Sequence, residues 1–385
     1  MTAPREDWPE RERGARSGPW LSVGGSGMPD LPAPSEASVP HGSGASRRAV
    51  ASGTAGAPGR SGDRIVVPPA DFASYYGRPI LKAPVWKRDI PSYLFSGGLA
   101  SGSALLAAGA RITGAPRLRA FTRVTSLAAL GASTYFLIND LGRPQRFHHM
   151  LRVAKPTSPM SMGTWILVGF GPAAGVAAVS ELAPWLPRRG PLGLLRRALP
   201  ISGDVAGYTA AAFAPALATY TGVLLADTAV PSWHDAYPQL PFVFAGSALV
   251  ASAGAALLGV PVGEAAPARR LALAGAAVEM AGGHRLERMG LTSEPYRTGR
   301  AGRLLRAGRF LLAAGAAGAL LGHRNRVVSA LSGALLVASS LAVRFGVFEA
   351  GLVSARDPKY TVVPQRERHA RRAATPTGGP AAPGG

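Results

Sequence analysis

Cysteine is absent from this 385-residue sequence, and histidine is scarce. Without cysteine the chain has no disulfide, cysteine-ligated zinc, iron–sulfur cluster or thiol nucleophile. A haem in a membrane cytochrome needs axial ligands, commonly histidines, held within helices. Five of the seven histidines lie in predicted tails and loops, and only His284 and His323 come near predicted helix ends. We therefore expect no haem, no iron–sulfur cluster and no other redox metal in this chain.

Charged residues are missing from long stretches in the middle of the chain. Asp, Glu, Lys and Arg do not occur in 90–110, 124–139, 156–180, 205–226, 236–263, 310–323 and 327–343. Several of these stretches reach the ~20 residues with which an α-helix crosses a bilayer core, and a soluble domain of this size could not bury all of them. A further segment is apolar around the acid Glu279. We predict an all-α membrane protein with eight transmembrane helices, near 90–110, 120–141, 161–186, 204–227, 237–260, 267–289, 302–322 and 327–350.

The two ends of the chain have a different composition. Residues 1–64 are dominated by Gly, Pro, Ser and Arg, and the sequence from about 365 onward has the same character. Such segments have too few aliphatic residues to form a core. We predict a disordered tail over 1–64, a juxtamembrane segment over 65–89, the membrane domain over 90–350, and a C-terminal tail over 351–385 that is disordered from about 365. The start of the chain has no apolar segment behind a basic one, so we expect no cleaved signal peptide.

The chain is strongly basic, with 42 Lys and Arg against 21 Asp and Glu, a net charge of +21. A basic surface can indicate nucleic-acid binding, but no basic patch interleaved with aromatic residues supports that function here. Eight crossings would place both termini on one side, where 21 basic residues flank the crossings against 12 on the other. The positive-inside rule then predicts a multi-pass protein of the cell membrane with both termini in the cytoplasm.

Polar residues gather near the predicted helix ends on the side of the termini. They include Asp89, Tyr93, Asp140, Tyr220, Asp227, Arg344 and Glu349. Ionisable residues at membrane depth are costly and usually face the interior of the bundle or a water-filled path. Three further acids, Glu181, Asp204 and Glu279, lie deeper or towards the opposite side. These acids could form a proton route, or they could be buried pairs that hold helices together, and the sequence favours neither.

Several sequence blocks around the predicted helices are specific and are not effects of composition. The first helix opens with WKRDIPSYLFSGGLASG (86–102), and the second ends in DLGRPQRF, followed by KPTSPMSMGTW (155–165). Similar blocks are LLADTAVPSW (224–233) and RFGVFEAGLVSARDPKYTVVPQRER (344–368). Together they resemble the NrfD/PsrC family, whose members are integral-membrane, polysulfide reductase-type subunits. The resemblance spans most of 75–365.

The resemblance implies a fold and a role. Family members have eight transmembrane helices in two four-helix bundles, anchor a complex and exchange electrons with menaquinone or ubiquinone. Their partners are a four-cluster ferredoxin-like iron–sulfur subunit and often a molybdopterin catalytic subunit. The chain would then be a non-catalytic or quinone-reactive subunit of an oxidoreductase complex. This agrees with the absence of cysteine and haem ligands, because the redox metals would belong to the partners.

Family positions can be carried over to the first and fourth helices. In the polysulfide reductase branch an Asn and a His of the first helix and a Tyr of the fourth line the quinone site. These positions fall on Ile90, on Tyr93, and on Thr219 or Tyr220. Phenol hydroxyls can donate hydrogen bonds to quinone carbonyls, and nearby acids can transfer protons.

From these positions we predict three groups of site residues and no catalytic or metal-binding residue. The quinone would be bound by Tyr93, Tyr220 and Asp89; protons would be transferred by Asp140, Asp227, Glu279, Asp204 and Glu181; and the loop or the docked partner would be held by Arg143, Arg146, His148 and Lys155.

Two other functions compete with that of a quinone-reactive subunit. A secondary transporter or proton channel would show broken helices at matching positions of two halves. Pro172 and Pro215 interrupt the third and fourth helices, but the seventh and eighth contain no matching pair. The other alternative is a purely structural anchor without a working quinone site.

Overall fold

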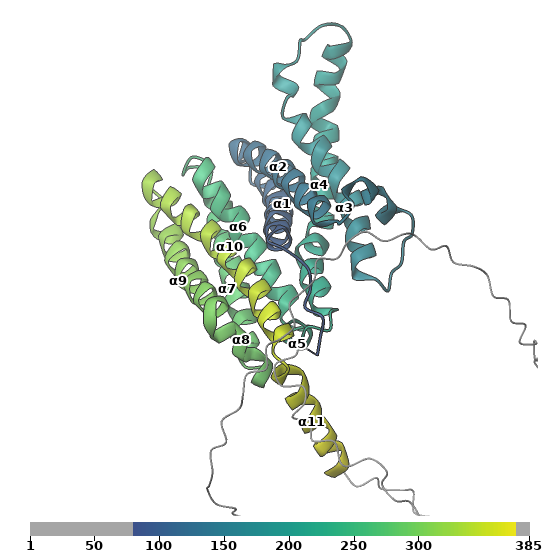
Figure 1. Ribbon diagram of the computed structural model, residues 1–385. Helices are drawn as coiled ribbons and strands as arrows, with labels where there is room; N and C mark the ends of the chain where they lie inside the picture. Colours follow the sequence, from purple (N-terminus) through teal and green to yellow (C-terminus); the bar gives the residue numbers. More distant parts are fainter. Residues whose placement is uncertain (1–79, 375–385) are drawn as a thin grey trace, which may run out of the picture. The chain divides into compact units, whose positions relative to one another are not determined.

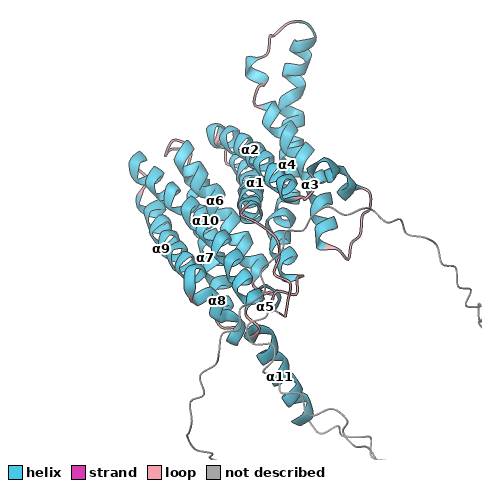
Figure 2. Ribbon diagram, viewed as in Figure 1, coloured by secondary structure: helices cyan, strands magenta, loops and turns pink. Residues whose placement is uncertain are grey.

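The computed structural model describes residues 80–374, and all regular secondary structure in this range is helical (Figures 1 and 2). The predicted tail over 1–64 and the last residues of the chain lie outside the described residues. Eight helices have 20 or more residues, namely α1 (Asp89–Ile112), α2 (Pro116–Asp140), α3 (Pro159–Ser180), α4 (Gly190–Ala226), α6 (Leu240–Gly259), α7 (Ala266–Leu286), α9 (Gly299–Leu321) and α10 (Arg326–Arg356). Seven of them overlap the charge-free stretches, and α7 covers the apolar segment around Glu279.

Short helices connect or follow the long ones. They are η2 (Pro144–Leu151), η3 (Ala183–Trp185), α5 (Pro231–Asp235), η4 (Gly290–Ser293), α8 (Glu294–Arg297) and α11 (Lys359–Ala374). Proline stands in the first turn of many helices, where its missing N–H costs nothing. Between α1 and α2 the chain reverses within a few residues, at Gly114 with φ +68°, a conformation that glycine adopts without strain.

Six helices are long and apolar enough to cross a membrane: α1, α3, α4, α6, α9 and α10. The other two long helices, α2 and α7, are not apolar enough over a length that could cross a membrane. Arg117, Arg119 and Arg123 lie in α2, and Arg269, Arg270 and Glu279 lie in α7. The all-helical, membrane-spanning character predicted from the sequence is therefore supported for six helices, and crossing by α2 and α7 stays a prediction.

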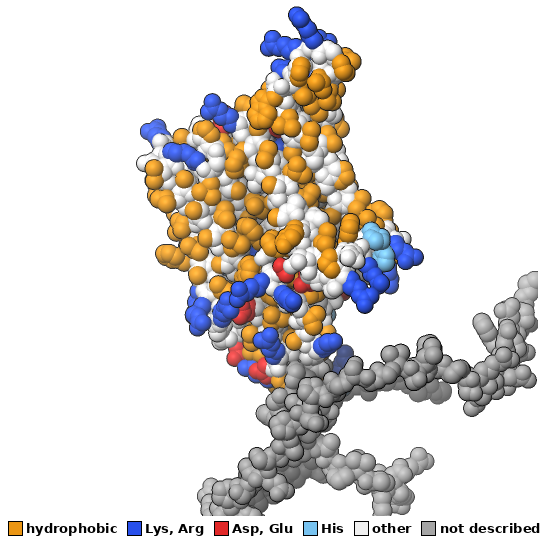
Figure 3. Space-filling model, turned by 45° about the horizontal axis from the view of Figure 1, so that its top comes forward, with side chains coloured by type: hydrophobic (Ala, Val, Ile, Leu, Met, Phe, Trp, Pro, Cys, Tyr) orange, Lys and Arg blue, Asp and Glu red, His pale blue; other side chains and the backbone are white. Residues whose placement is uncertain are grey.

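The helices pack as neighbouring pairs in chain order. The most extensive contacts join α1 to α2, α3 to α4, α6 to α7 and α9 to α10, and α1 and α6 contact each other and α4. We call the end of the helices at which α1 begins and α10 ends the Asp89 end, and the opposite one the Ile112 end. Hydrophobic side chains cover the middle of the face in Figure 3, and Lys and Arg gather towards its two ends. This pattern is typical of a surface that faces lipid between two aqueous layers.

Two helices differ from their predicted bounds. α4 begins at Gly190 rather than near 204, because Leu, Arg and Ala in the added segment favour helix. At the C-terminus the helix α11 runs to Ala374, although disorder was expected from about 365. Its sequence contains four Arg and three Ala, which are good helix formers even without a buried face.

The core at the Asp89 end is built around Trp233, which is fully buried. Its indole nitrogen donates a hydrogen bond to the Val347 carbonyl at 2.8 Å, and Trp86 stacks on it with ring centroids 5.9 Å apart. Tyr296 donates to the Ser232 carbonyl at 2.9 Å. Burial raises the pKa of Tyr296, which keeps this hydroxyl protonated as a donor. These contacts fix α5 and α8 against α10, and the candidate site lies beside them.

Candidate functional site

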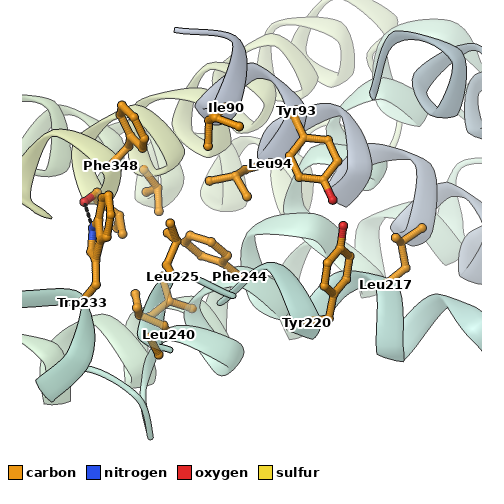
Figure 4. Packing of buried hydrophobic residues seen from close by; sticks show 14 of the residues in the cluster. Ile90, Tyr93, Leu94, Leu217, Tyr220, Leu225, Trp233, Leu240, Phe244 and Phe348 are labelled. Atoms are coloured by element: carbon orange, nitrogen blue, oxygen red, sulfur yellow. Dashed lines mark hydrogen bonds between the residues drawn. The ribbon is translucent and has the colours of Figure 1, made fainter. Parts of the chain in front are cut away.

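A small cavity lies at the Asp89 end between α1, α2, α3 and α4, with a volume of about 60 Å³. The tyrosines Tyr93 of α1 and Tyr220 of α4 line it, and their hydroxyl groups point toward each other (Figure 4). Most of the other lining side chains are apolar, namely Trp86, Ile90, Leu137, Leu141, Met150, Met160, Leu167 and Leu224, beside Asp140 and Thr164. The cavity is thus an apolar slot with two phenols facing across it.

Both phenols are held in place by close packing. Tyr93 is 2% exposed and Tyr220 is 8% exposed, yet no hydrogen bond joins either hydroxyl to another described residue. On α3, the hydrogen of Gly163 faces the Tyr220 ring so closely that a Cβ at this position would overlap ring atoms. Two buried phenol donors without partners are an arrangement that a hydrogen-bond acceptor in the cavity would complete.

The structure distinguishes between the two candidates on the fourth helix. Tyr220 lines the cavity, whereas Thr219 does not, and the Thr219 hydroxyl donates to the Pro215 carbonyl of its own helix at 2.8 Å. Ile90, on which the family asparagine position falls, also lines the cavity. At this position of the lining Ile90 offers no hydrogen-bond donor, whereas Tyr93 and Tyr220 each offer one.

The acids predicted near this site are not all brought to the cavity. Asp140 lines it, at the last residue of α2. Asp89 lies outside the lining and accepts a hydrogen bond from the Asn139 amide at 3.2 Å. Asp227 follows the last residue of α4 and is exposed. Of the predicted acids, Asp140 is the one placed to exchange a proton with the cavity.

The predicted docking residues lie on one exposed loop that joins α2 to α3. Arg143, Arg146, His148 and Lys155 are all exposed there. No ion pair joins Asp140 to either arginine within the described part of the chain. Met150, on η2 of the same loop, lines the cavity. The loop therefore closes the cavity on one side and presents basic side chains to the aqueous phase on the other.

The acids Glu181 and Asp204 lie towards the Ile112 end in a cluster of ion pairs. Arg123 of α2, only 5% exposed, contacts the Glu181 and Asp204 carboxylates, each at 2.9 Å. Arg119 pairs with Glu181 at 2.9 Å, and Arg111 pairs with Asp204 at 2.8 Å. This geometry favours the alternative in which these acids join α1, α2, α3 and α4, and a role in proton transfer stays a prediction.

Glu279 lies in the second half of the protein, apart from both groups. It is 4% exposed on α7 and interacts electrostatically with Arg344 of α10, which is fully buried. Arg344 donates to the Phe244 carbonyl at 2.8 Å and lies 4.0 Å above the centroid of that ring. One carboxylate oxygen of Glu279 has no hydrogen-bond partner among the described residues, and Glu279 lines a second, mainly apolar cavity of about 240 Å³.

The sequence did not single out Arg123 or Gly163. Gly203 and Gly207 give space for the Arg123 guanidinium, since a Cβ on Gly207 would lie 3.0 Å from it. A basic residue in the first turn of a predicted membrane helix, together with two glycines four residues apart in a later helix, is the signal that could have indicated the buried cluster. For Gly163 the signal was its place in the block that ends at Trp165.

Within residues 80–374, no group of three or more His, Asp or Glu side chains is placed to hold a metal ion. Residues 81–265 match the family model described as polysulphide reductase, NrfD. The match includes α1 to α6 and both sides of the tyrosine cavity, and it agrees with the resemblance drawn from the sequence blocks. No curated protein matches the chain.

Proposed function

We propose, from its membership of the NrfD polysulphide reductase family, that this integral membrane protein is the quinone-reactive membrane subunit of an oxidoreductase complex. In this role it exchanges electrons between membrane quinone and an iron–sulfur partner. The observation that supports the proposal is the pair of facing phenols, Tyr93 and Tyr220, in an apolar slot at the Asp89 end.

The residues of the slot fit a quinone head group. Quinone is a lipid-soluble two-electron carrier with two carbonyl oxygens that accept hydrogen bonds. Tyr93 and Tyr220 supply two donors without other partners, and the apolar side chains around them exclude water. The cavity of about 60 Å³ is narrow, so binding requires side chains such as Met150 and Met160 to move aside.

Proton transfer would take place at Asp140. Its carboxylate lines the cavity and is near the loop between α2 and α3, so it can relay a proton between the slot and water. Asp89, next to Asn139, would assist from outside the slot rather than bind quinone directly. Asp227 is exposed and would at most accept protons at the surface.

The partner would dock at the Asp89 end. Electrons pass between groups only over short distances, so the iron–sulfur subunit must contact the face nearest the tyrosine slot. The exposed loop with Arg143, Arg146, His148 and Lys155 lies at that face and offers basic contacts to an acidic partner. A molybdopterin subunit would then bind to the iron–sulfur subunit.

Packing supports eight crossings in two four-helix bundles. α2 has 25 residues and packs along α1 after a tight turn, so it must return across the layer that α1 crosses. The same holds for α7 beside α6. We place α1 to α4 in one bundle and α6, α7, α9 and α10 in the other, in the cell membrane with both termini in the cytoplasm.

Separate substitution of Tyr93→Phe and Tyr220→Phe tests the quinone site. Each change removes one hydroxyl and keeps the ring, and we expect quinol-linked turnover of the assembled complex to fall by about tenfold, because a donor to the carbonyl is lost. Tyr135→Phe is the matched control, since Tyr135 is 63% exposed. Unchanged turnover in both variants of an intact complex would instead favour the purely structural anchor.

A further inference from the structure

A basic groove opens at the Asp89 end, apart from the tyrosine slot. It lies between the start of α1, the start of α9 and the end of α10, and encloses about 540 Å³. Four cationic side chains line it, from Lys87, Arg88, Arg300 and Arg356, with one acid, Glu349. The proposed quinone function does not use any of these residues.

The polar and apolar parts of the groove lie at different depths. Lys87 and Arg88 directly precede α1, Arg300 is in the first turn of α9, and Arg356 ends α10. Leu352 and Phe345 line the same groove further along α10. With a rise of 1.5 Å per residue, Phe345 lies roughly 16 Å deeper along the helix axis than Arg356. The groove is thus basic at the water boundary and apolar below it.

The cations at the mouth are not neutralised. Arg88 and Arg356 are exposed and have no ion-pair partner within residues 80–374. Glu349 is paired with Arg300, but the distance is 3.7 Å and the Arg300 side chain is 62% exposed. The mouth therefore keeps an excess of positive charge, and its guanidinium groups are suited to phosphate oxygens.

We propose that this groove binds one anionic phospholipid. The phosphate of the head group would lie among Arg88, Arg300 and Arg356, and an acyl chain would run along Leu352 and Phe345 into the bilayer. A basic pocket between helix ends at the cytoplasmic surface is a form of site that recognises anionic lipid head groups. A free phosphate would use only the mouth, and an acidic protein would leave the deep apolar half unfilled, so the two-level lining favours a lipid.

The bound lipid would also contact the wall of the tyrosine slot. Trp86 lines both the groove and the slot, so a lipid in the groove and a molecule in the slot would contact the same side chain. The lipid site does not depend on the quinone function, because Trp86 is shared but the charged residues and the ligand are different.

The test is lipid binding by the full-length protein in detergent, by native mass spectrometry with phosphatidylglycerol and phosphatidylcholine. We expect one phosphatidylglycerol to be retained in preference to phosphatidylcholine. Arg88→Gln with Arg356→Gln should weaken its binding by about twenty-five-fold, at roughly fivefold per arginine. The matched control is Arg285→Gln with Arg306→Gln, which removes the same charge from exposed positions at the same end. Arg88→Lys with Arg356→Lys should restore most of the binding.

Several results would overturn the proposal. One is equal retention of the two lipids by the wild-type protein, or an equal loss in the control pair. Another is complete displacement of phosphatidylglycerol by millimolar inorganic phosphate, which would indicate a site for a small anion. A further one is that the variant with Arg88→Gln and Arg356→Gln binds the lipid as well as the wild-type protein does but loses a partner subunit, which would indicate a protein-docking surface. Photoreactive phosphatidylglycerol on the wild-type protein needs no variant, and labelling away from 86–92, 345–356 and the start of α9 around Arg300 would also contradict the site.

Discussion

At the scale of single residues, Gly163 explains part of the sequence block KPTSPMSMGTW. Its backbone lies against the Tyr220 ring, and a Cβ in its place would overlap that ring. The block thus has a physical role in the slot, because a residue without a side chain lets α3 approach α4 where Tyr220 must turn inward. Tyr220 in turn is what α4 contributes to the cavity.

Gly163→Ala is expected to displace the Tyr220 ring and to reduce quinol-linked turnover at least as much as Tyr220→Phe. The added methyl group cannot be accommodated without a shift of the ring or of the helix. Gly175→Ala on the same helix is the control, since no atom lies within 4 Å of a Cβ there, and alanine favours helix by about 1 kcal/mol over glycine. Equal turnover in the two variants would contradict the packing described for Tyr220.

At the scale of helices, buried charged side chains connect helices whose arrangement hydrophobic contact alone would not determine. In lipid, helices gain little from burying apolar surface against one another, so specific polar contacts and close packing decide how they associate. Arg123 connects α2 with the carboxylates of α3 and α4. Arg344 connects α10 with the Phe244 carbonyl of α6 and interacts with Glu279 of α7.

Arg123→Gln should lower the melting temperature of the purified protein. Removing one partner of a buried pair costs about 3–5 kcal/mol when the other charge is left alone. Here Arg119 and Arg111 still pair with Glu181 and Asp204, so we expect a loss below that range. The control is Arg117→Gln, because the Arg117 side chain is 72% exposed and lies 3.8 Å from Glu264. An equal loss in the control would show that the buried cluster does not stabilise the helices.

Glu279 and Arg344 should be coupled in a double-mutant cycle. Glu279→Gln leaves the buried Arg344 cation without its opposite charge, and Arg344→Gln leaves the carboxylate in the same position. We expect the double variant to be destabilised less than the sum of the single ones, by about 1 kcal/mol or more in thermal or denaturant unfolding. Additive losses would mean that the two charges do not stabilise each other.

At the scale of the whole molecule, topology follows from the number of crossings. Six and eight are both even numbers, so either one places the termini on the same side of the membrane. The two counts differ in whether α2 and α7 return across the bilayer. The excess of basic residues on the side of the termini predicts that this side is cytoplasmic.

The absence of cysteine makes this topology easy to test. Thr113→Cys lies between α1 and α2, and Gln145→Cys lies in the loop after α2. In intact cells an impermeant maleimide should label the cysteine at position 113 and not the one at 145, and both should react after lysis. Labelling of both positions in intact cells would contradict a crossing by α2, and labelling of 145 alone would reverse the orientation.

The positions of the long helices were predictable, but the faces that they turn to one another were not. Seven charge-free stretches and the apolar segment around Glu279 indicate where helices run. Neighbouring residues on a helix differ by about 100° in direction, so the choice between Thr219 and Tyr220 depends on the rotation of α4. The part of α4 over 205–226 is rich in Ala and carries no charge, and its sequence does not mark an inner face.

The sequence by itself determined the class of this protein. Uncharged stretches long enough to span a bilayer must satisfy their backbone hydrogen bonds within helices, because lipid offers no partners. This requirement is local, so the sequence alone predicts the helices. The tertiary structure decided which groups meet: Tyr93 with Tyr220, Arg123 with Glu181 and Asp204, and the four cations with the apolar wall of the groove. These contacts join distant segments, and because lipid is as apolar as the core, hydrophobicity alone could not select them.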